Sequence, residues 1–313
     1  MKLNKPKFWD EKKNFISILF FPLSLVVLLF IYIKKKITKV VKFNIPIICV
    51  GNIYLGGTGK TPTSIFLANA LLRLGKKPVI LRKYYKDHSD EYDLIKNEFN
   101  SLILNHNRIE GIKEAEENNF NCIILDDGFQ DYKIEKDLNI VCFNENQLVG
   151  NGLVIPSGPL RESLNALSKA HIILINGKKN ISFEKKILDF NKDLEIFYSY
   201  YKPTNLNQFR NKKLLAIAAI GNPENFFKLL IDNGLNIEKK LIFPDHYVFS
   251  KNEIIKIVEE ATNKDYQIVT TEKDYFKIKN FNIHKIKYLK VSLEIQEKEK
   301  IIKKINKLYD KKN

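Results

Sequence analysis

The chain has 313 residues, of which 44% are hydrophobic and 28% charged, and this composition excludes a mainly disordered protein. The length predicts two domains, each with its own core. The formal net charge of +16 favours anionic partners such as nucleotides, nucleic acid or acidic lipid headgroups, without deciding among them. Cys49, Cys122 and Cys142 lie in apolar runs without metal-binding spacing, which predicts buried, reduced thiols in a cytoplasmic protein without structural zinc.

The first apolar segment is uncharged over residues 15–33 and has lysines on both sides. As a helix it is just long enough to cross a bilayer core of about 30 Å. Its apolar core is long for a secretory signal and no small-residue cleavage site follows, so membrane contact is expected. Three alternatives stay open: a spanning helix, a helix lying on acidic headgroups, or a helix packed onto the domain.

From Pro46 onward, short apolar runs alternate with helical stretches, a pattern typical of a parallel sheet with helices on both faces. Strands are predicted at 46–50, 77–82, 121–127, 138–143 and 171–176. A second alternation follows a Lys/Asn-rich stretch, with helices at 223–234 and 251–264 and strands at 212–221, 266–271 and 286–293. We therefore predict a membrane-associated helix over 1–42, a nucleotide-binding α/β domain over 43–195, a linker over 196–211 and a smaller α/β domain over 212–313.

The strand IICVGN runs into IYLGGTGKTPTS and then into an apolar-periodic helix, the order that a phosphate-binding loop requires. Backbone N–H groups of such a loop converge on phosphate oxygens at the positive end of the helix. The usual first glycine of the motif is Tyr54 here. The predicted nucleotide-binding residues are Gly56, Gly57, Thr58, Gly59, Lys60 and Thr61, with Lys60 on the β and γ phosphates and Thr61 on Mg²⁺.

Several acidic and basic residues could complete this site. The apolar run CIILDD ends in Asp126 and Asp127, as a magnesium-binding strand would, although a simple turn explains the same letters. The pair Asp90 and Glu91 could orient a hydroxyl acceptor or only cap a helix. Further candidates are Arg161 and Glu162, expected at the start of a helix, and His246 in the second domain.

Taken together, VGNIYLGGTGKTP, the Asp90–Glu91 pair, LDDGFQ, GPLRE, FPDHY and TTEKD resemble the tetraacyldisaccharide 4'-kinase family of the lipid A pathway. The resemblance runs from the apolar amino terminus to about residue 277. It implies a P-loop kinase-like fold and transfer of the γ-phosphate of ATP, with Mg²⁺, to the 4'-hydroxyl of an acylated disaccharide 1-phosphate. It also implies the cytoplasmic face of the inner membrane of a Gram-negative-type bacterium, an anionic lipid surface as partner, and no nucleic acid; oligomeric state is not predicted.

The resemblance also implies roles for individual residues. Asp90 corresponds to the catalytic carboxylate and His246 to the histidine that assists it, while Lys60 and Arg161 act on the phosphates. The metal set is Thr61, Asp126, Asp127 and Glu162, and Arg108 lies near the transferring phosphate. Because His246 belongs to the second domain, closure of one domain on the other is expected to assemble the site.

Some positions depart from the family pattern. The family's SRGYG reads LRKYYK here, which keeps Arg82 and Tyr84 but replaces glycines with Lys83 and Tyr85. The segment before Asp90 is shortened, and a family histidine is replaced by Asp131. The main alternative function is a membrane-associated P-loop ATPase that couples hydrolysis to partner binding or transport. Nucleic-acid binding has only the net charge in its favour.

Overall fold

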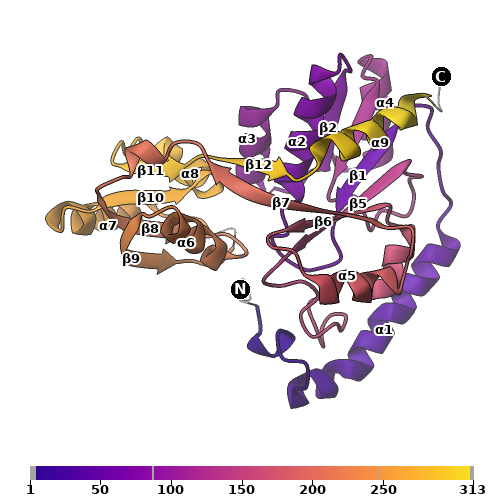
Figure 1. The fold of residues 1–313 in the computed structure, drawn as a ribbon, viewed down its shortest axis with the longest axis horizontal. Coiled ribbons are helices and arrows are strands. Elements are labelled where there is room, and N and C mark those ends of the chain that lie inside the picture. Colours follow the sequence, from indigo (N-terminus) through magenta and orange to yellow (C-terminus); the bar gives the residue numbers. More distant parts are fainter. Residues whose placement is uncertain (1–4, 87, 246, 311–313) are drawn as a thin grey trace. The chain divides into compact units, whose positions relative to one another are not determined.

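The computed structural model describes residues 5–86, 88–245 and 247–310, and within them the chain divides into two compact units. The larger unit comprises residues 5–84, 99–200 and 294–310, and the smaller one residues 85–98 and 201–293. Figure 1 follows the chain through both in colour. The predicted α/β fold class is confirmed: each unit has a mainly parallel sheet with helices packed on it, and an apolar helix lies near the amino terminus.

In the described chain, eight strands form the first sheet, in the order β12-β7-β6-β5-β1-β4-β2-β3. Their bounds are β1 Ile47–Gly51, β2 Pro78–Lys83, β3 Leu102–Asn105, β4 Cys122–Asp126, β5 Leu138–Asn144, β6 Ile172–Asn176, β7 Glu195–Pro203 and β12 Val291–Ile295. β1, β4, β5 and β6 are buried along their whole length, as expected for the apolar central strands of a parallel sheet.

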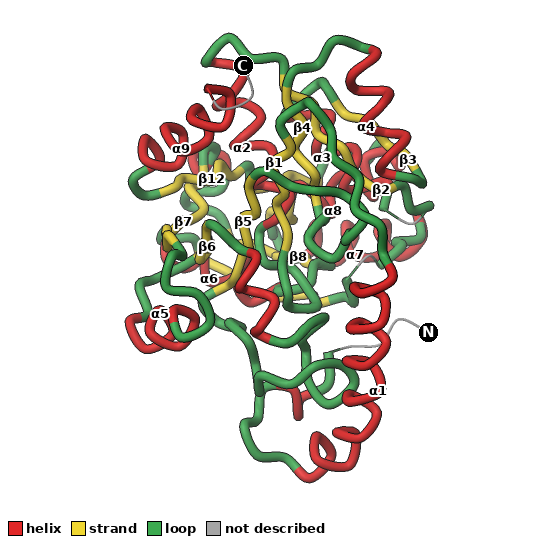
Figure 2. Tube along the Cα trace, turned by 90° about the vertical axis from the view of Figure 1, so that its right-hand side faces the viewer, coloured by secondary structure: helices red, strands yellow, loops and turns green. Residues whose placement is uncertain are grey.

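The larger unit has five α-helices in the described chain: α1 Phe15–Ile37, α2 Lys60–Arg73, α4 Arg108–Glu117, α5 Ile181–Leu188 and α9 Lys298–Asp310. Helices cover both faces of its sheet, whereas α1 lies beside loops (Figure 1, Figure 2). Residues of α4 and α5 form one apolar cluster with alternate side chains of the strands, among them Cys49. α2 packs on the other face, where Thr63 contacts Cys142. All three cysteines are buried and free, and burial raises the pKa of Cys49 to about 11.

The order of the strands determines where a ligand site can form. β1 lies between β4 and β5. The strands that follow β1 in sequence, β2 to β4, lie on one side of it, and β5 to β7 lie on the other side. Ligands of such sheets bind at the carboxyl ends of the strands, where the strand order reverses. The register pairs Asp126 with both Val50 and Arg82, so the ends of β1, β2 and β4 lie at one edge.

The smaller unit has its own parallel sheet in the order β11-β10-β8-β9, as the second alternation predicts. Its elements are α3 Ser89–Glu98, β8 Lys213–Ala218, α6 Pro223–Asp232, β9 Asn236–Ile242, α7 Lys251–Asn263, β10 Gln267–Thr271, α8 Glu272–Ile278 and β11 Ile286–Leu289. Two separate apolar clusters cover its faces, one including Phe227 of α6 and the other Ile254 of α7.

Two local details differ from the sequence prediction. The strand predicted over 286–293 is interrupted at Lys290, and its two halves, β11 and β12, belong to different sheets. Lys290 leaves the strand pattern because its ammonium pairs with Glu98 at 2.9 Å and its N–H donates to Asn205. Arg161 and Glu162 do not begin a helix: they lie in a bend before a short 3-10 helix, Leu164–Lys169.

The compact units are also less contiguous than the predicted domain ranges. The segment that carries Asp90 belongs to the smaller unit, because the acidic side chains of α3 pair with lysines in and around α8. The terminal helix α9 belongs to the larger unit. The predicted linker over 196–211 contains most of β7. The assignment of one function to each domain range stays a prediction.

The smaller unit should respond to pH through Glu272. Burial, and then the nearby Glu98 carboxylate, raise the pKa of Glu272 to about 7. The folded unit therefore holds this proton more tightly than the unfolded chain, so stability is lost as pH rises from about 4.5 through 7. At pH 8 we expect Glu272→Gln to raise the free energy of unfolding by on the order of 2 kcal/mol, and the thermal midpoint with it. At pH 5 the substitution should change the stability little. The exposed Glu259→Gln is the control, and an unaltered pH profile in Glu272→Gln would contradict the account.

Candidate functional site

The predicted phosphate loop joins β1 to α2, which begins at Lys60. Gly59 adopts φ 90°, in the left-handed region that favours glycine, and its carbonyl accepts from Thr63 N–H. The loop is braced from inside by Asn52, whose amide donates to Gly56 O at 3.2 Å and to Thr58 Oγ1 at 3.0 Å. Lys60 and Thr61 therefore stand in the first turn of a helix whose amino end faces the loop.

Tyr54, at the position of the missing motif glycine, is fully buried. Its backbone forms a bridge with Leu160, and Leu55 N–H donates to Pro159 O at 2.8 Å. Where the motif has a flexible glycine, this chain thus has a tyrosine whose ring is buried in the core beneath the loop. The departure from the motif leaves the strand, loop and helix order intact.

Asp126, at the end of β4, is fully buried and bonded to the first turns of α2. Its Oδ2 accepts from Thr61 Oγ1 and its Oδ1 from Ser64 Oγ, both at 3.0 Å. Arg82, at the end of β2, donates to Asp126 Oδ2 and to Thr61 Oγ1. A buried carboxylate needs such partners, and they hold the hydroxyl and carboxylate oxygens together.

Asp127, the next residue, turns toward different cations because its φ is 57°. Lys60 Nζ lies 3.6 Å from Asp127 Oδ1, and Arg161 Nη1 donates to the same oxygen at 3.0 Å. Burial alone would raise the pKa of Asp127, but Lys60, Arg161 and Arg82 hold it well below its usual range. Burial lowers the pKa of Lys60, and Asp127 opposes that shift. Lys60 and Arg161 are thus gathered on the Asp127 carboxylate beside the loop.

Arg108 begins α4 and points back to this strand end. Its Nη2 donates to Asp127 O at 2.8 Å, and its Nη1 lies 3.3 Å from Asp131 Oδ2. The residue that replaces the family histidine therefore pairs with Arg108. Lys136 also donates to the backbone carbonyl of Asp131.

Glu162 is nearly enclosed and pairs with a different element from the other predicted metal ligands. Its carboxylate lies 2.6 Å from Lys35 Nζ, near the end of α1. Lys35 Nζ also lies 4.9 Å from the centre of the Tyr132 ring. Burial, and then the Glu162 carboxylate, raise the pKa of Tyr132. Thr61, Asp126 and Asp127 are thus brought together around α2, and Glu162 contacts α1.

Asp90 is buried in the smaller unit and held by two lysines. Lys273 Nζ and Lys277 Nζ lie 3.7 Å and 3.6 Å from Asp90 Oδ2. Lys273 also pairs with Asp245 at 3.3 Å, the residue before His246. His246 itself lies outside the described residues, so its pairing with Asp90 stays a prediction. Buried ion pairs exclude the alternative of a solvated capping carboxylate for Asp90.

Sequence reasoning gave no role to Lys35, Lys273 and Lys277, and noted Arg82 only as a retained family residue. For Lys273 and Lys277, the TTEKD motif is the available signal. Thr271 Oγ1 and Ala219 N–H donate to Asp274, the last residue of that motif, and the Asp274 carboxylate in turn lies 2.7 Å from Lys277 Nζ. Nothing in the sequence distinguishes Lys35 from its neighbours Lys34 and Lys36.

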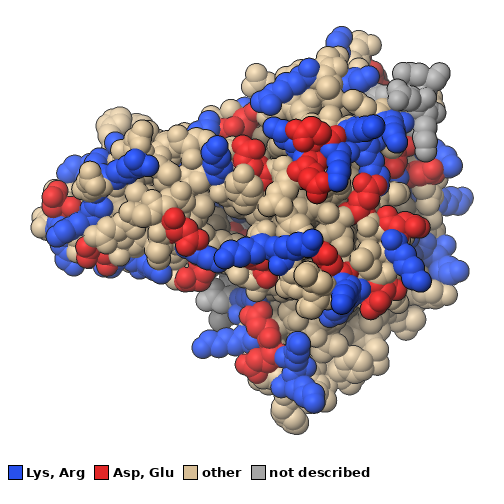
Figure 3. Space-filling view, in the orientation of Figure 1, with Lys and Arg blue, Asp and Glu red and all other residues tan. Residues whose placement is uncertain are grey.

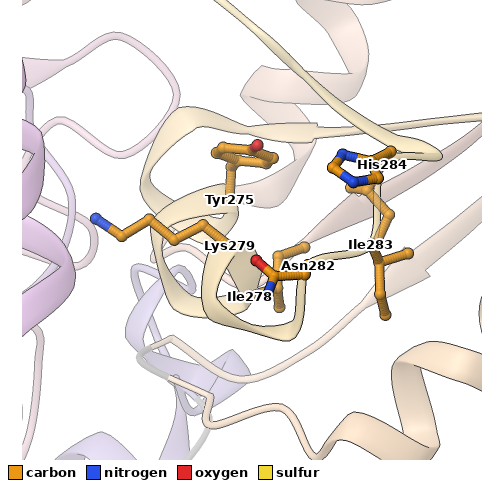
Figure 4. Close-up of a pocket in the computed structure, with 7 residues that line it drawn as sticks. Tyr275, Ile278, Lys279, Asn282, Ile283 and His284 are labelled. Atoms are coloured by element: carbon orange, nitrogen blue, oxygen red, sulfur yellow. The ribbon is translucent and has the colours of Figure 1, made fainter.

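A metal cluster of acidic, histidine and cysteine side chains is not found among the described residues, and the cavity that the structure shows lies elsewhere. Among the described positions, no group of three or more His, Cys, Asp or Glu side chains is arranged so that it could hold a metal ion. A cavity of about 110 Å³ lies in the smaller unit, lined by Tyr275, Ile278, Asn282 and His284 among others (Figure 4). None of the predicted site residues lines it, and the Lys279 side chain extends away from it (Figure 4).

A model of the family described as tetraacyldisaccharide-1-P 4'-kinase matches residues 16–310. The chain belongs to this family. A tetraacyldisaccharide 4'-kinase of Pelagibacter ubique is 39% identical over 99% of this chain and 100% of its own length. One of Francisella tularensis subsp. novicida is 33% identical over 92% of this chain and 98% of its own length.

A solved structure shows the same fold. LpxK from Aquifex aeolicus, determined in complex with ATP, aligns with a TM-score of 0.71 at 23% identity, over 93% of this chain and 99% of that one. The predicted family and fold are confirmed.

The family's phosphate loop offers a test of backbone strain. A side chain at Gly59 would be forced into the left-handed region, whereas a Cβ at Gly57 would meet nothing within 4 Å. We expect Gly59→Ala to lower the free energy of unfolding by about 1–2 kcal/mol and Gly57→Ala to leave it near wild type. Urea unfolding of the two variants measures this, and equal stabilities would contradict the loop geometry.

Proposed function

We propose that the chain transfers the γ-phosphate of ATP to the 4'-hydroxyl of a tetraacyldisaccharide 1-phosphate, in lipid A biosynthesis. The observation that carries the proposal is the charged cluster at the end of β4, where Lys60 and Arg161 converge on Asp127. Phosphoryl transfer needs positioning and charge neutralisation more than covalent chemistry, and these cations beside a helix amino terminus provide both.

The hydroxyl and carboxylate oxygens beside the loop suit Mg²⁺, which prefers one or two carboxylates together with phosphate oxygens and water. Thr61 Oγ1 and Asp126 Oδ2 lie 3.0 Å apart, and with Asp127 they are the residues that would hold the ion. The bound ion would neutralise phosphate charge. Arg82 contacts the same two oxygens, so it orients them toward the loop. We propose that Glu162, which pairs with Lys35, does not belong to this set.

For the acceptor, we assign the proton of the sugar hydroxyl to Asp90, with His246 as its partner. The two lysines beside Asp90 fix the carboxylate within the smaller unit, which suits a group that must orient one hydroxyl. The nucleotide is assigned to the larger unit.

We further propose that α1 attaches the protein to an anionic bilayer, at the cytoplasmic face of the inner membrane. α1 is the one helix in the described chain that is long and apolar enough to cross a membrane. Its serines, Ser17 and Ser24, are buried against the larger unit, whereas Leu19, Leu29 and Phe30 are exposed. The helix turns polar groups toward the protein and apolar ones outward, which favours lying in one leaflet over crossing it.

The views agree with this reading of the surface. Figures 1 and 2 show α1 on the outside of its own unit, beside loops. In Figure 3 the surface over the middle of this region is largely tan, and charged side chains stand toward its two ends.

The acceptor assignment is tested by Asp90→Asn, with Asp93→Asn on the same helix as control. Asp93 is partly exposed and pairs with Lys279 at 2.9 Å. With ³²P-ATP and the purified disaccharide 1-phosphate, we expect kcat to fall by about 10²–10⁴-fold in Asp90→Asn and little in Asp93→Asn. Near wild-type kcat in Asp90→Asn sinks the assignment. ATP hydrolysis stimulated by a protein, with no label in the lipid, would favour the P-loop ATPase instead.

Membrane attachment is tested by Leu29→Glu, matched to Leu72→Glu on α2, because the two leucines are 57% and 54% exposed. Losing one inserted leucine and adding a charge should weaken binding to phosphatidylglycerol vesicles by about tenfold or more. Leu72→Glu should sediment with vesicles as wild type does. If both variants bind equally well, the exposed face of α1 is not the attachment surface.

A further inference from the structure

The Glu162 carboxylate has a partner that its predicted metal role does not explain. Its side chain is 3% exposed, and in the described part of the chain the basic group paired with it is Lys35, at 2.6 Å. The Tyr132 ring lies under the same ammonium. A buried carboxylate that loses its paired cation becomes strongly unfavourable, so the Lys35 ammonium helps to fix the position of Glu162.

The residues just before Glu162 form part of the wall of the phosphate loop. Leu55 N–H donates to Pro159 O at 2.8 Å, and Arg161 N–H donates to Ile53 O at 2.7 Å. The Arg161 guanidinium then reaches Asp127 at 3.0 Å. Any displacement of Glu162 is therefore passed to its neighbour Arg161, which is part of the proposed phosphate site.

The segment upstream is fastened to α1 as well. Ser24 Oγ bonds Val154 O at 2.7 Å and accepts from Ser157 N–H at 3.1 Å. Asn151 donates to Ser17 Oγ at 3.1 Å and to Ser157 O at 2.9 Å. Residues 151–162 thus connect the apolar helix on one side to the phosphate loop on the other.

We propose that Lys35 is a positioning residue for phosphate transfer, whose ion pair with Glu162 holds Arg161 against Asp127 and links the seating of α1 to the phosphate site. The proposal rests on the proposed kinase function. It makes α1 part of the catalytic framework as well as a membrane attachment, and it gives Glu162 a role through Arg161 in place of metal binding.

The test compares Lys35→Ala with Lys36→Ala, which removes the same charge from the same lysine run. Lys36 Nζ lies 5.9 Å from the Tyr32 ring of α1 itself. In detergent solution, with the disaccharide 1-phosphate as acceptor, we expect Lys35→Ala to lower kcat by about tenfold or more, since a displacement of about 1 Å can cost up to 10²-fold. The KM for ATP should change little, and Lys35→Arg should restore most of kcat. Lys36→Ala should match wild type.

A double-mutant cycle separates this role from metal binding. In a Glu162→Gln background, adding Lys35→Ala should cause no further loss, because the two act as one pair. If Glu162 instead holds the metal, Glu162→Gln raises the Mg²⁺ concentration needed for half-maximal activity while Lys35→Ala matches Lys36→Ala. That pattern would overturn the proposal.

Trp9 supplies a readout that needs no turnover. It is the single tryptophan of the chain, and its Nε1 donates to Pro156 O at 3.0 Å, within the connecting segment. Adding the non-hydrolysable analogue AMP-PNP should change Trp9 emission in wild type and Lys36→Ala, and much less in Lys35→Ala although calorimetry shows the analogue bound. An identical response in both lysine variants would refute the link. If wild type transfers no phosphate to the disaccharide yet the two variants still differ in emission, the acceptor assignment fails and the positioning role stands.

Discussion

The proposed phosphate site depends on two adjacent carboxylates, Asp126 fully buried and Asp127 partly buried, that are both held by cations. Asp126 is enclosed at the end of β4 and recruits Arg82 together with the hydroxyls of α2. Asp127, turned aside by its positive φ, gathers Lys60 and Arg161. Because ionised carboxylates in a protein interior must be paired, folding alone concentrates positive charge where phosphate oxygens would bind. The arrangement is therefore formed in advance by the architecture of the sheet.

Much of this site could be predicted from the sequence because its parts are local. A glycine-rich loop between a strand and a helix, and a strand that ends in two aspartates, can each be recognised within about ten residues, and the parallel sheet brings them to one edge. The TTEKD motif marks the segment that carries the lysines of α8 but not their partner Asp90, and Lys35 has no such signal, because both contacts join residues far apart in the sequence. The break at Lys290 could not be predicted either, because the residues on both sides of it form strands and read as one continuous strand in the sequence.

The apolar helix illustrates how composition and packing carry different information. Hydropathy alone left a spanning helix, a surface helix and a packed helix open. The serines decide which side faces the protein, because Ser24 bonds backbone groups of the connecting segment while Leu29 stays exposed. One helix can thus contact lipid on one face and support the catalytic framework on the other, which would keep the phosphate site close to an acylated substrate.

The most direct test of the central claim is ³¹P NMR of the product formed from ATP and purified tetraacyldisaccharide 1-phosphate. The account predicts a second phosphomonoester signal, coupled to the sugar proton at the 4' carbon, beside an unchanged signal from the 1-phosphate, and it predicts that the new signal depends on Lys60. Release of inorganic phosphate alone, or a new phosphate on another oxygen, would contradict it.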